Sequence, residues 1–261
     1  MIGIGIGNSI ASKQPGGGFS LDGLGLDLKI WYDFSTSTDS HGTDVGTFPN
    51  AGNTGSTHNL VQDAETTEPT VDTAGMKLKC LKFDNVNDGF ALANEFDSAN
   101  TNTIAAVIKS NTGAWNWDNI FSGTTAGVNR IYVESAYKLS LRYNANYPPD
   151  PFNSTIGIFL NNTDNGTINY PLPTTSVEVL ILRKDGSNNL HIYNKNGDKI
   201  AYLAYSDSFL DMGVGIGYVG TREASNESFG GFIGELAVFD GHVDEATCQT
   251  IATGLRDKWS L

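Results

Sequence analysis

Short turn signals recur along most of this chain, and they constrain its fold more than any other feature. Asp-Gly or Asn-Gly pairs stand at 22–23, 88–89, 165–166, 185–186, 196–197 and 240–241, and between them lie short runs rich in β-branched and aromatic residues. This spacing is typical of antiparallel all-β sandwiches and barrels. The nearly continuous apolar run Val177–Lys184 predicts a strand covered on both faces. Leu190–Leu203 predicts a hairpin in which Asn196 and Gly197 supply the positive φ angles of the turn.

One segment near the C-terminus departs from the β pattern and predicts a helix over Asp244–Trp259. Asp244 is a suitable N-cap, acidic residues stand in the first turn and basic residues in the last, as the helix dipole favours. Five residues fall on one face at helical spacing, namely Cys248, Ile251, Ala252, Leu255 and Trp259. The helix is therefore expected to pack by this face on the sandwich.

Residues 1–27 are glycine-rich and predict an N-terminal extended arm, followed by one domain over 28–261. The segment does not fit a secretory signal peptide, because no basic residue precedes Lys13 and glycines interrupt every apolar step. In an extended strand, Ile2, Ile4 and Ile6 share one face, and the alternating glycines let another backbone approach closely. We expect the arm to dock onto a neighbouring molecule. The alternative is that it folds back on its own sandwich as an edge strand.

The net charge of −13 argues against two classes of partner. An acidic surface repels nucleic-acid phosphates and anionic membranes, and no window approaches the about 18 apolar residues of a membrane span. We therefore expect no nucleic acid as partner and no membrane insertion. Cys80 and Cys248 are the two cysteines and have no zinc-ligand spacing, so two buried thiols are expected rather than a disulfide.

Five segments between Leu28 and Leu261 follow one another in a characteristic order: LKIWYDFSTS, LKFDNVNDGFAL, NTIAAVIKS, LHIYNKNG and FGGFIGELAVFDGHVDEATCQTIATGLRDKW. In this order they resemble the concanavalin A-like, laminin-G-type jelly-roll family. The last segment is the most specific, since a Phe-x-Gly-x-Ile-Gly-Glu strand leads to a turn and a final helix. The resemblance implies an all-β fold, a two-sheet antiparallel jelly-roll sandwich with an N-terminal extended arm and one C-terminal helix. Lectins, hydrolases, adhesion modules and viral coat components share this fold.

Two tryptophans form the most suggestive local feature for binding. Trp115 and Trp117 would point the same way from an extended segment, and Asn116, Asp118 and Asn119 add polar groups. Aromatic faces of this kind stack on the apolar side of a sugar ring. The alternative is that both rings pack under a loop or against a neighbouring subunit, which is the commoner fate of tryptophan. If the chain binds carbohydrate, these two residues are the predicted site.

Metal and catalytic sites have weaker support in the sequence. The loop Asp84–Gly89 lacks the third oxygen ligand of an EF-hand, and its aspartates are expected to form the turn. Relatives by resemblance often bind calcium, but no ligands are assignable here and no other cofactor is expected. Glycosidases of this fold place carboxylates at alternate positions of one strand, whereas Glu134, Glu178 and Glu235 each stand alone. Glu235 matches the structural glutamate of the family. We expect no enzymatic activity.

These observations lead to one expected function with two alternatives. The expected function is a structural or adhesion protein of a virion, as a capsid decoration, fibre or spike component of a phage or similar virus. Such a protein would be made in the host cytoplasm without a signal peptide. Its partners would be other virion proteins or itself as a homo-oligomer, with cell-surface glycans as a further ligand. The alternatives are a free-standing carbohydrate-binding lectin and a glycoside hydrolase of the same fold.

Overall fold

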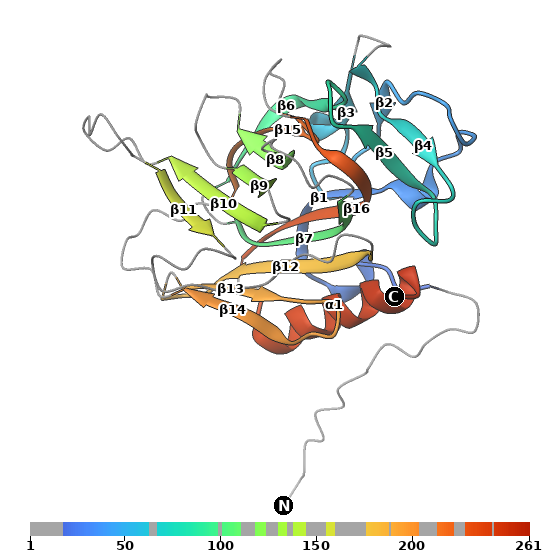
Figure 1. Cartoon of the computed structure of the whole chain (residues 1–261). Coiled ribbons are helices and arrows are strands. Elements are labelled where there is room, and N and C mark those ends of the chain that lie inside the picture. Colours follow the sequence, from blue (N-terminus) through green and yellow to red (C-terminus); the bar gives the residue numbers. More distant parts are fainter. Residues whose placement is uncertain are drawn as a thin grey trace, which may run out of the picture.

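Two antiparallel β-sheets pack face to face, and an α-helix lies on the outer face of one sheet (Figure 1). The computed structural model describes residues 18–62, 67–98, 101–110, 118–123, 130–134, 138–144, 155–159, 176–187, 189–203, 213–221, 228–241 and 243–261. All pairings between strands are antiparallel within this part of the chain. The predicted all-β sandwich with a C-terminal helix is confirmed.

Within the described residues, each sheet contains eight strands. The first sheet has the order β14 (Lys199–Leu203), β13 (Leu190–Tyr193), β12 (Glu178–Lys184), β7 (Thr101–Ser110), β16 (Gly230–Asp240), β5 (Cys80–Asp84) and β4 (Thr70–Asp72), with β1 (Asp27–Asp33) also paired to β16. The second sheet has the order β11 (Thr155–Phe159), β10 (Lys138–Asn144), β9 (Arg130–Glu134), β8 (Asp118–Gly123), β15 (Gly213–Val219), β6 (Phe90–Ser98), β3 (Leu60–Val61) and β2 (Thr47–Phe48).

The described part of the chain has one long helix and three short helical turns. The α-helix α1 spans Glu245–Trp259, and single 3-10 turns occur at Asp22–Leu24, Phe34–Thr36 and Gly55–His58. The Asp244 side chain caps α1 by accepting a hydrogen bond from the Thr247 backbone N–H at 2.7 Å, as predicted. The five residues predicted for the packing face are all buried. Within the described residues, no helix has the length and apolar character needed to cross a membrane.

Two hydrophobic clusters lie on opposite faces of the first sheet. In β12, Leu180 and Leu182 belong to the cluster between the sheets, whereas Val179 and Ile181 belong to the cluster under α1. All seven residues of β12 are buried, which confirms that this strand is covered on both sides. The alternation follows from the two-residue period of a strand, which sends successive side chains to opposite faces.

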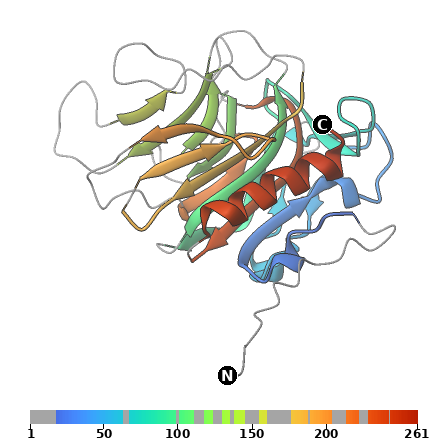
Figure 2. The same cartoon turned by 90° about the horizontal axis from the view of Figure 1, so that it is seen from below.

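Residues 18–26, which the sequence assigned to the arm, pack against the body of the protein. Phe19, Leu21, Leu24 and Leu26 contribute to the cluster under α1, and Leu21 is fully buried. Figure 2 shows this N-terminal segment and β1 in blue beside α1. Residues 1–17, with Ile2, Ile4 and Ile6, lie outside the described residues, so docking by the arm stays a prediction.

The predicted β13–β14 hairpin is present, but its turn differs from the expected one. Gly197 has a φ of +78°, whereas Asn196 does not have a positive φ. The Asn194 side chain accepts hydrogen bonds from the backbone N–H groups of Asn196 and Asp198, which closes a longer loop. A register shift between Ile192 and Tyr193 accompanies this loop. A loop of this kind needs only one left-handed residue, and glycine supplies it.

Candidate functional site

The loop between β5 and β6 is built by two aspartates. The Asp84 Oδ1 atom accepts hydrogen bonds from the backbone N–H groups of Val86, Asn87 and Asp88 at 2.8, 3.1 and 3.3 Å. Asp88 Oδ2 in turn accepts from the Asp84 N–H at 2.8 Å. These bonds confirm that both aspartates form the turn. The loop holds the side chain of Val86 in solvent at its tip, with 62% of the residue exposed.

The carboxyl group of Asp88 has an unusual environment. Asp88 is buried, and burial raises its pKa to about 7, with further raising by the charges of Asp84 and Asp44. Lys82 acts in the opposite direction. Among the described residues, no group of three or more His, Cys, Asp or Glu side chains is arranged to hold a metal ion. Asp88 is therefore a buried titratable group that helps to form the β5–β6 loop.

The β5–β6 loop is fastened to the end of β15. A Cβ atom at Gly89 would overlap the Thr221 side chain, so the absence of a side chain at position 89 permits this close approach. Gln62 Nε2 donates to the Gly89 carbonyl at 2.8 Å, and Ser122 Oγ donates to the Thr221 carbonyl at 2.7 Å. The start of β6, the end of β15 and β8 are thus joined to one another, and we call this part of the molecule the loop end of the second sheet.

The predicted sugar-binding residues Trp115 and Trp117 lie outside the described residues. The strand that follows them, β8, begins at Asp118. The Gly220 N–H donates to the Ile120 carbonyl, which places the start of β8 beside the end of β15. The start of β8 therefore lies at the loop end of the second sheet. Binding of a ligand by the two tryptophans stays a prediction.

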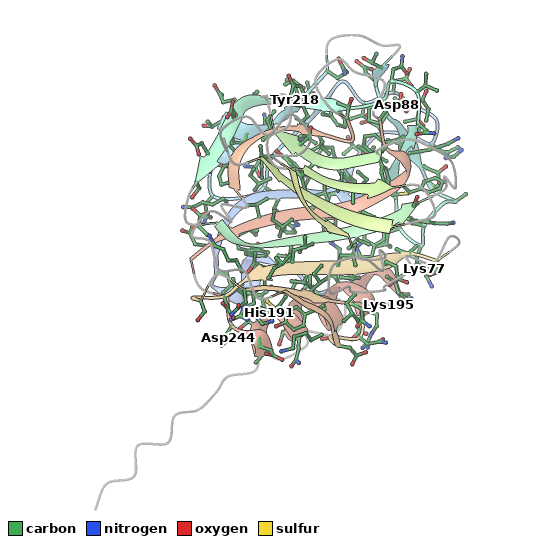
Figure 3. All side chains as sticks on the ribbon, turned by 60° about the vertical axis from the view of Figure 1, so that its left-hand side comes forward. Lys77, Asp88, His191, Lys195, Tyr218 and Asp244 are labelled. Carbon is green, nitrogen blue, oxygen red and sulfur yellow. The ribbon has the colours of Figure 1, made fainter. Side chains whose placement is uncertain are left out.

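Tyr218 is a residue at this end that the sequence analysis missed. Its neighbour Val219 is buried in the core and pairs with Phe90 and Phe121, so Tyr218 lies on the opposite, outward face of the second sheet. It is half-buried and pairs with Ser122 across the strands. Figure 3 shows Tyr218 and Asp88 at one end of the molecule, and His191 and Asp244 at the other. The sequence pattern that could have indicated this position is the alternation of glycine with larger residues in β15.

Glu235 belongs to a buried ionic network rather than to this surface. Its carboxylate accepts hydrogen bonds from Trp31 Nε1 at 2.8 Å, Trp259 Nε1 at 3.1 Å and Lys258 Nζ at 2.7 Å. Lys258 also contacts the Asp33 carboxylate at 2.6 Å. The network joins β1, β16 and the end of α1. These contacts agree with the structural role that the resemblance implied for Glu235.

Other reactive groups are held in internal contacts too. Cys80 and Cys248 are buried free thiols, as expected, and burial raises the pKa of each to about 12. Thiols with such a pKa are poor nucleophiles near neutral pH. His191 Nε2 lies 2.8 Å from Asp185 Oδ2, and Asp185 also accepts hydrogen bonds from Ser187 and Asn189. With two further bonds from the Asn189 side-chain amide, five contacts to one carboxylate indicate that it holds the β12–β13 turn together.

Comparisons with known proteins find similarity to solved structures, but none to a family model or to a curated protein. No protein-family model matches the chain, and no curated protein matches it. The binding domain of Paraclostridial Mosquitocidal Protein 1 superposes with a TM-score of 0.61 at 12% identity, over 89% of this chain and 55% of that one. Domain 4 of AbnA, an arabinanase from Geobacillus stearothermophilus solved with arabinotriose, gives a TM-score of 0.55 at 16% identity, over 87% and 99%.

A third match is the receptor-binding domain of botulinum neurotoxin type G, with a TM-score of 0.53 at 8% identity, over 87% of this chain and 51% of that one. This chain thus spans about half the length of the two toxin domains and nearly the full length of the arabinanase domain. At these identities the likeness shows the fold alone. The chain has the β-sandwich architecture of carbohydrate- and receptor-binding domains.

Proposed function

We propose that this protein is a non-enzymatic binding module that recognises glycans. The observation that carries the proposal is the match with arabinanase domain 4, a domain solved with arabinotriose, because 99% of that domain is covered. The binding domains of the two toxins, which this chain resembles in fold, support the same class of function. The proposed contact region is the loop end of the second sheet, with Trp115 and Trp117 as the stacking residues.

We further propose that the module serves as a structural or adhesion component of a virion, joined to other virion proteins or to copies of itself. The support is the sequence of the arm, in which Ile2, Ile4 and Ile6 alternate with glycine. Residues 19–26 pack on the body beside α1. An arm docked on a neighbouring molecule would therefore be joined to the folded domain through this packed segment.

The glycan proposal is tested with the double variant Trp115→Ala/Trp117→Ala on a glycan array. We expect the wild type to bind and the double variant to lose binding, because each lost stacking contact removes apolar contact with the sugar. Gln249 lies on the exposed face of α1, which covers the first sheet and not the second. Gln249→Ala is therefore the matched control and is expected to bind like the wild type. Circular dichroism checks that all three proteins are folded.

Other results would redirect or end the proposal. Retained binding by a folded double variant would move the site to other residues, and no binding to any glycan would contradict the function. Turnover of a polysaccharide panel, abolished by a single Glu→Gln or Asp→Asn change, would show that the protein is a hydrolase. The panel is therefore run with the wild type alongside the array.

A further inference from the structure

Three ionisable side chains from distant parts of the chain meet in the buried network around Glu235. Asp33, at the end of β1, is paired in register with Glu235 of β16, so two carboxyl groups lie opposite each other on neighbouring strands. Two like charges placed in this way repel each other. Lys258, in the last turn of α1, contacts both: its Nζ atom lies 2.6 Å from Asp33 Oδ2 and 2.7 Å from Glu235 Oε2. One amine thus touches two carboxyl groups.

Solvent has little access to these three groups. The side chains of Lys258 and Asp33 are 11% and 10% exposed, and that of Glu235 is 2% exposed. The indole N–H groups of Trp31 and Trp259 both donate to the Glu235 carboxylate, and Trp259 is fully buried. Burial of charged groups costs free energy, so conversion of an ammonium and a carboxylate into a neutral amide is more favourable here than in water.

The two oxygens of Asp33 have different surroundings. Asp33 Oδ1 accepts hydrogen bonds from the Ser35 backbone N–H at 3.2 Å and from Ser35 Oγ at 2.6 Å, whereas Oδ2 faces Lys258. Donors aimed at one oxygen stabilise the negative charge that develops there when a nucleophile attacks the carboxyl carbon. Ser35 therefore favours charge on Oδ1, and Oδ2 is the oxygen that can leave.

Glu235 is placed to move protons between the other two groups. Burial raises the pKa of Glu235, the charge of Asp33 raises it further, and Lys258 acts in the opposite direction. A carboxylate with a raised pKa is a better proton acceptor than an ordinary glutamate. Because Glu235 Oε2 contacts Nζ directly, it can take a proton from the Lys258 ammonium and leave a neutral amine, which is the nucleophilic form.

We propose that Lys258 and Asp33 form an intramolecular amide bond, with Glu235 as the proton relay. The lone pair of Lys258 Nζ attacks the Asp33 carboxyl carbon, the bond from this carbon to Oδ2 breaks, and Oδ2 departs as water with two of the three ammonium protons. Glu235 carries these protons from Nζ to Oδ2 and ends unchanged. One ammonium and one carboxylate thus become one amide and one water. The reaction takes place once in each chain and is independent of the proposed glycan binding.

The amide bond joins the first strand of the first sheet to the end of the C-terminal helix. It encloses residues 33–258 in a covalent loop that contains nearly the whole domain. A covalent link of this kind restricts the unfolded chain and stabilises the fold. A protein that is held in an assembly, or bound to a surface, is then protected against being pulled apart from either end of the domain.

Intact-mass spectrometry of the full chain under denaturing conditions tests the proposal. We expect the mass of the wild type to be lower than that of its sequence by one water molecule, directly after purification or after prolonged incubation in native buffer. Trypsin should fail to cleave after Lys258. The peptide that contains Asp33 should be recovered joined to the peptide that contains Lys258.

Two variants connect the lost water to the three groups. Lys258→Arg keeps the positive charge but cannot form the amide, so it should have the full mass of its sequence. Glu235→Gln keeps the shape of the side chain but cannot relay protons, and it should also have the full mass. Lys29→Arg is the matched control, because Lys29 lies 2.9 Å from Asp27 in a more exposed ion pair. This control should keep the mass deficit of the wild type. Circular dichroism checks that each protein is folded.

Several results would overturn the inference. Full mass of the folded wild type after prolonged incubation would do so, and this measurement decides even where a variant fails to fold. A mass deficit that persists in Lys258→Arg would also do so, because the water would then have been lost elsewhere in the chain. A deficit retained in folded Glu235→Gln would overturn the role of Glu235 as the relay.

Discussion

Asp88 illustrates how this fold changes the chemistry of a single residue. Only 7% of the residue is exposed, and Asp84 and Asp44 add negative charge nearby, so the pKa of the carboxyl group rises from 3.8 to about 7. In the unfolded chain the same group titrates near its ordinary value. Below pH 3.8 the group is protonated in both states. Above pH 7 the folded state bears a buried, ionised carboxylate next to other carboxylates, and stability is lost as the pH rises through the folded pKa.

We therefore expect Asp88→Asn to remove this pH dependence. The amide keeps an oxygen that can accept the Asp84 N–H bond but carries no charge. At pH 8 the variant should have a free energy of unfolding about 1–2 kcal/mol above that of the wild type, and near pH 4 the difference should be small. Urea unfolding at both pH values measures this. Asp97→Asn, at an exposed position of the following strand β6, is the control and should show little difference at either pH.

Part of this residue-scale picture could be predicted from the sequence. The preference of Asp and Asn for turns predicted the roles of Asp84 and Asp88, and the motif around Glu235 predicted a buried structural glutamate. The raised pKa of Asp88 could not be predicted, because it depends on burial and on Asp44, which is far away in the sequence. The same holds for Lys258, which reaches Asp33 of β1 as well as Glu235.

At the scale of elements, α1 shows a glycine whose role depends on packing. Gly254 lies inside the helix, where alanine would normally be favoured by about 1 kcal/mol. A Cβ atom at this position, however, would overlap the ring of Phe19. The glycine thus lets the N-terminal segment lie flat against the helix. This contact joins residues 235 positions apart in the chain, and no local pattern in either segment predicts it.

The contact predicts that Gly254→Ala lowers the free energy of unfolding in the wild type and raises it in a Phe19→Ala background. Gly254→Ala in the wild type should lower the free energy of unfolding by about 1–2 kcal/mol, because overpacking outweighs the gain in helix propensity. In a Phe19→Ala background the same substitution should raise it by up to about 1 kcal/mol, since the obstructing ring is gone. Urea unfolding of the four proteins measures the coupling. Equal effects in both backgrounds would refute the contact.

The elements that the sequence predicted well are those whose signals are local. The Asp244 cap and the helical spacing of the buried residues gave α1, and the apolar run gave β12. The β13–β14 turn was predicted less well, because the Asn194 side chain organises the loop and leaves Gly197 as its residue with positive φ. Side-chain hydrogen bonds to the backbone compete with the standard two-residue turn. The register in which β9 pairs with β10 has no such local signal in the sequence.

At the scale of the whole molecule, the two faces of the first sheet are covered by different parts of the protein. One side packs against the second sheet, at whose loop end we proposed the glycan contacts. The other side is closed by α1 and by residues 19–26. Attachment through the arm and recognition of a ligand would therefore use different parts of the molecule. This arrangement lets a protein be held in an assembly while its binding face stays available.

Deletion of residues 2–18 tests this separation of tasks. The deletion leaves Phe19 and Leu21, so the cluster under α1 is kept, and we expect the truncated protein to remain folded with little change in its unfolding transition. It should also bind glycans like the full chain. What it should lose is assembly into its oligomer or particle, because the face formed by Ile2, Ile4 and Ile6 is gone.

The control is the full chain with Ile2, Ile4 and Ile6 changed to serine, which keeps the length of the arm and removes its apolar face. Analytical ultracentrifugation of the three proteins measures their assembly, and calorimetry measures their unfolding. We expect both altered proteins to fail in assembly in the same way. If the truncated protein unfolds, the arm belongs to the core of its own sandwich. If both altered proteins assemble normally, the arm has no docking role and a free-standing lectin becomes the better account.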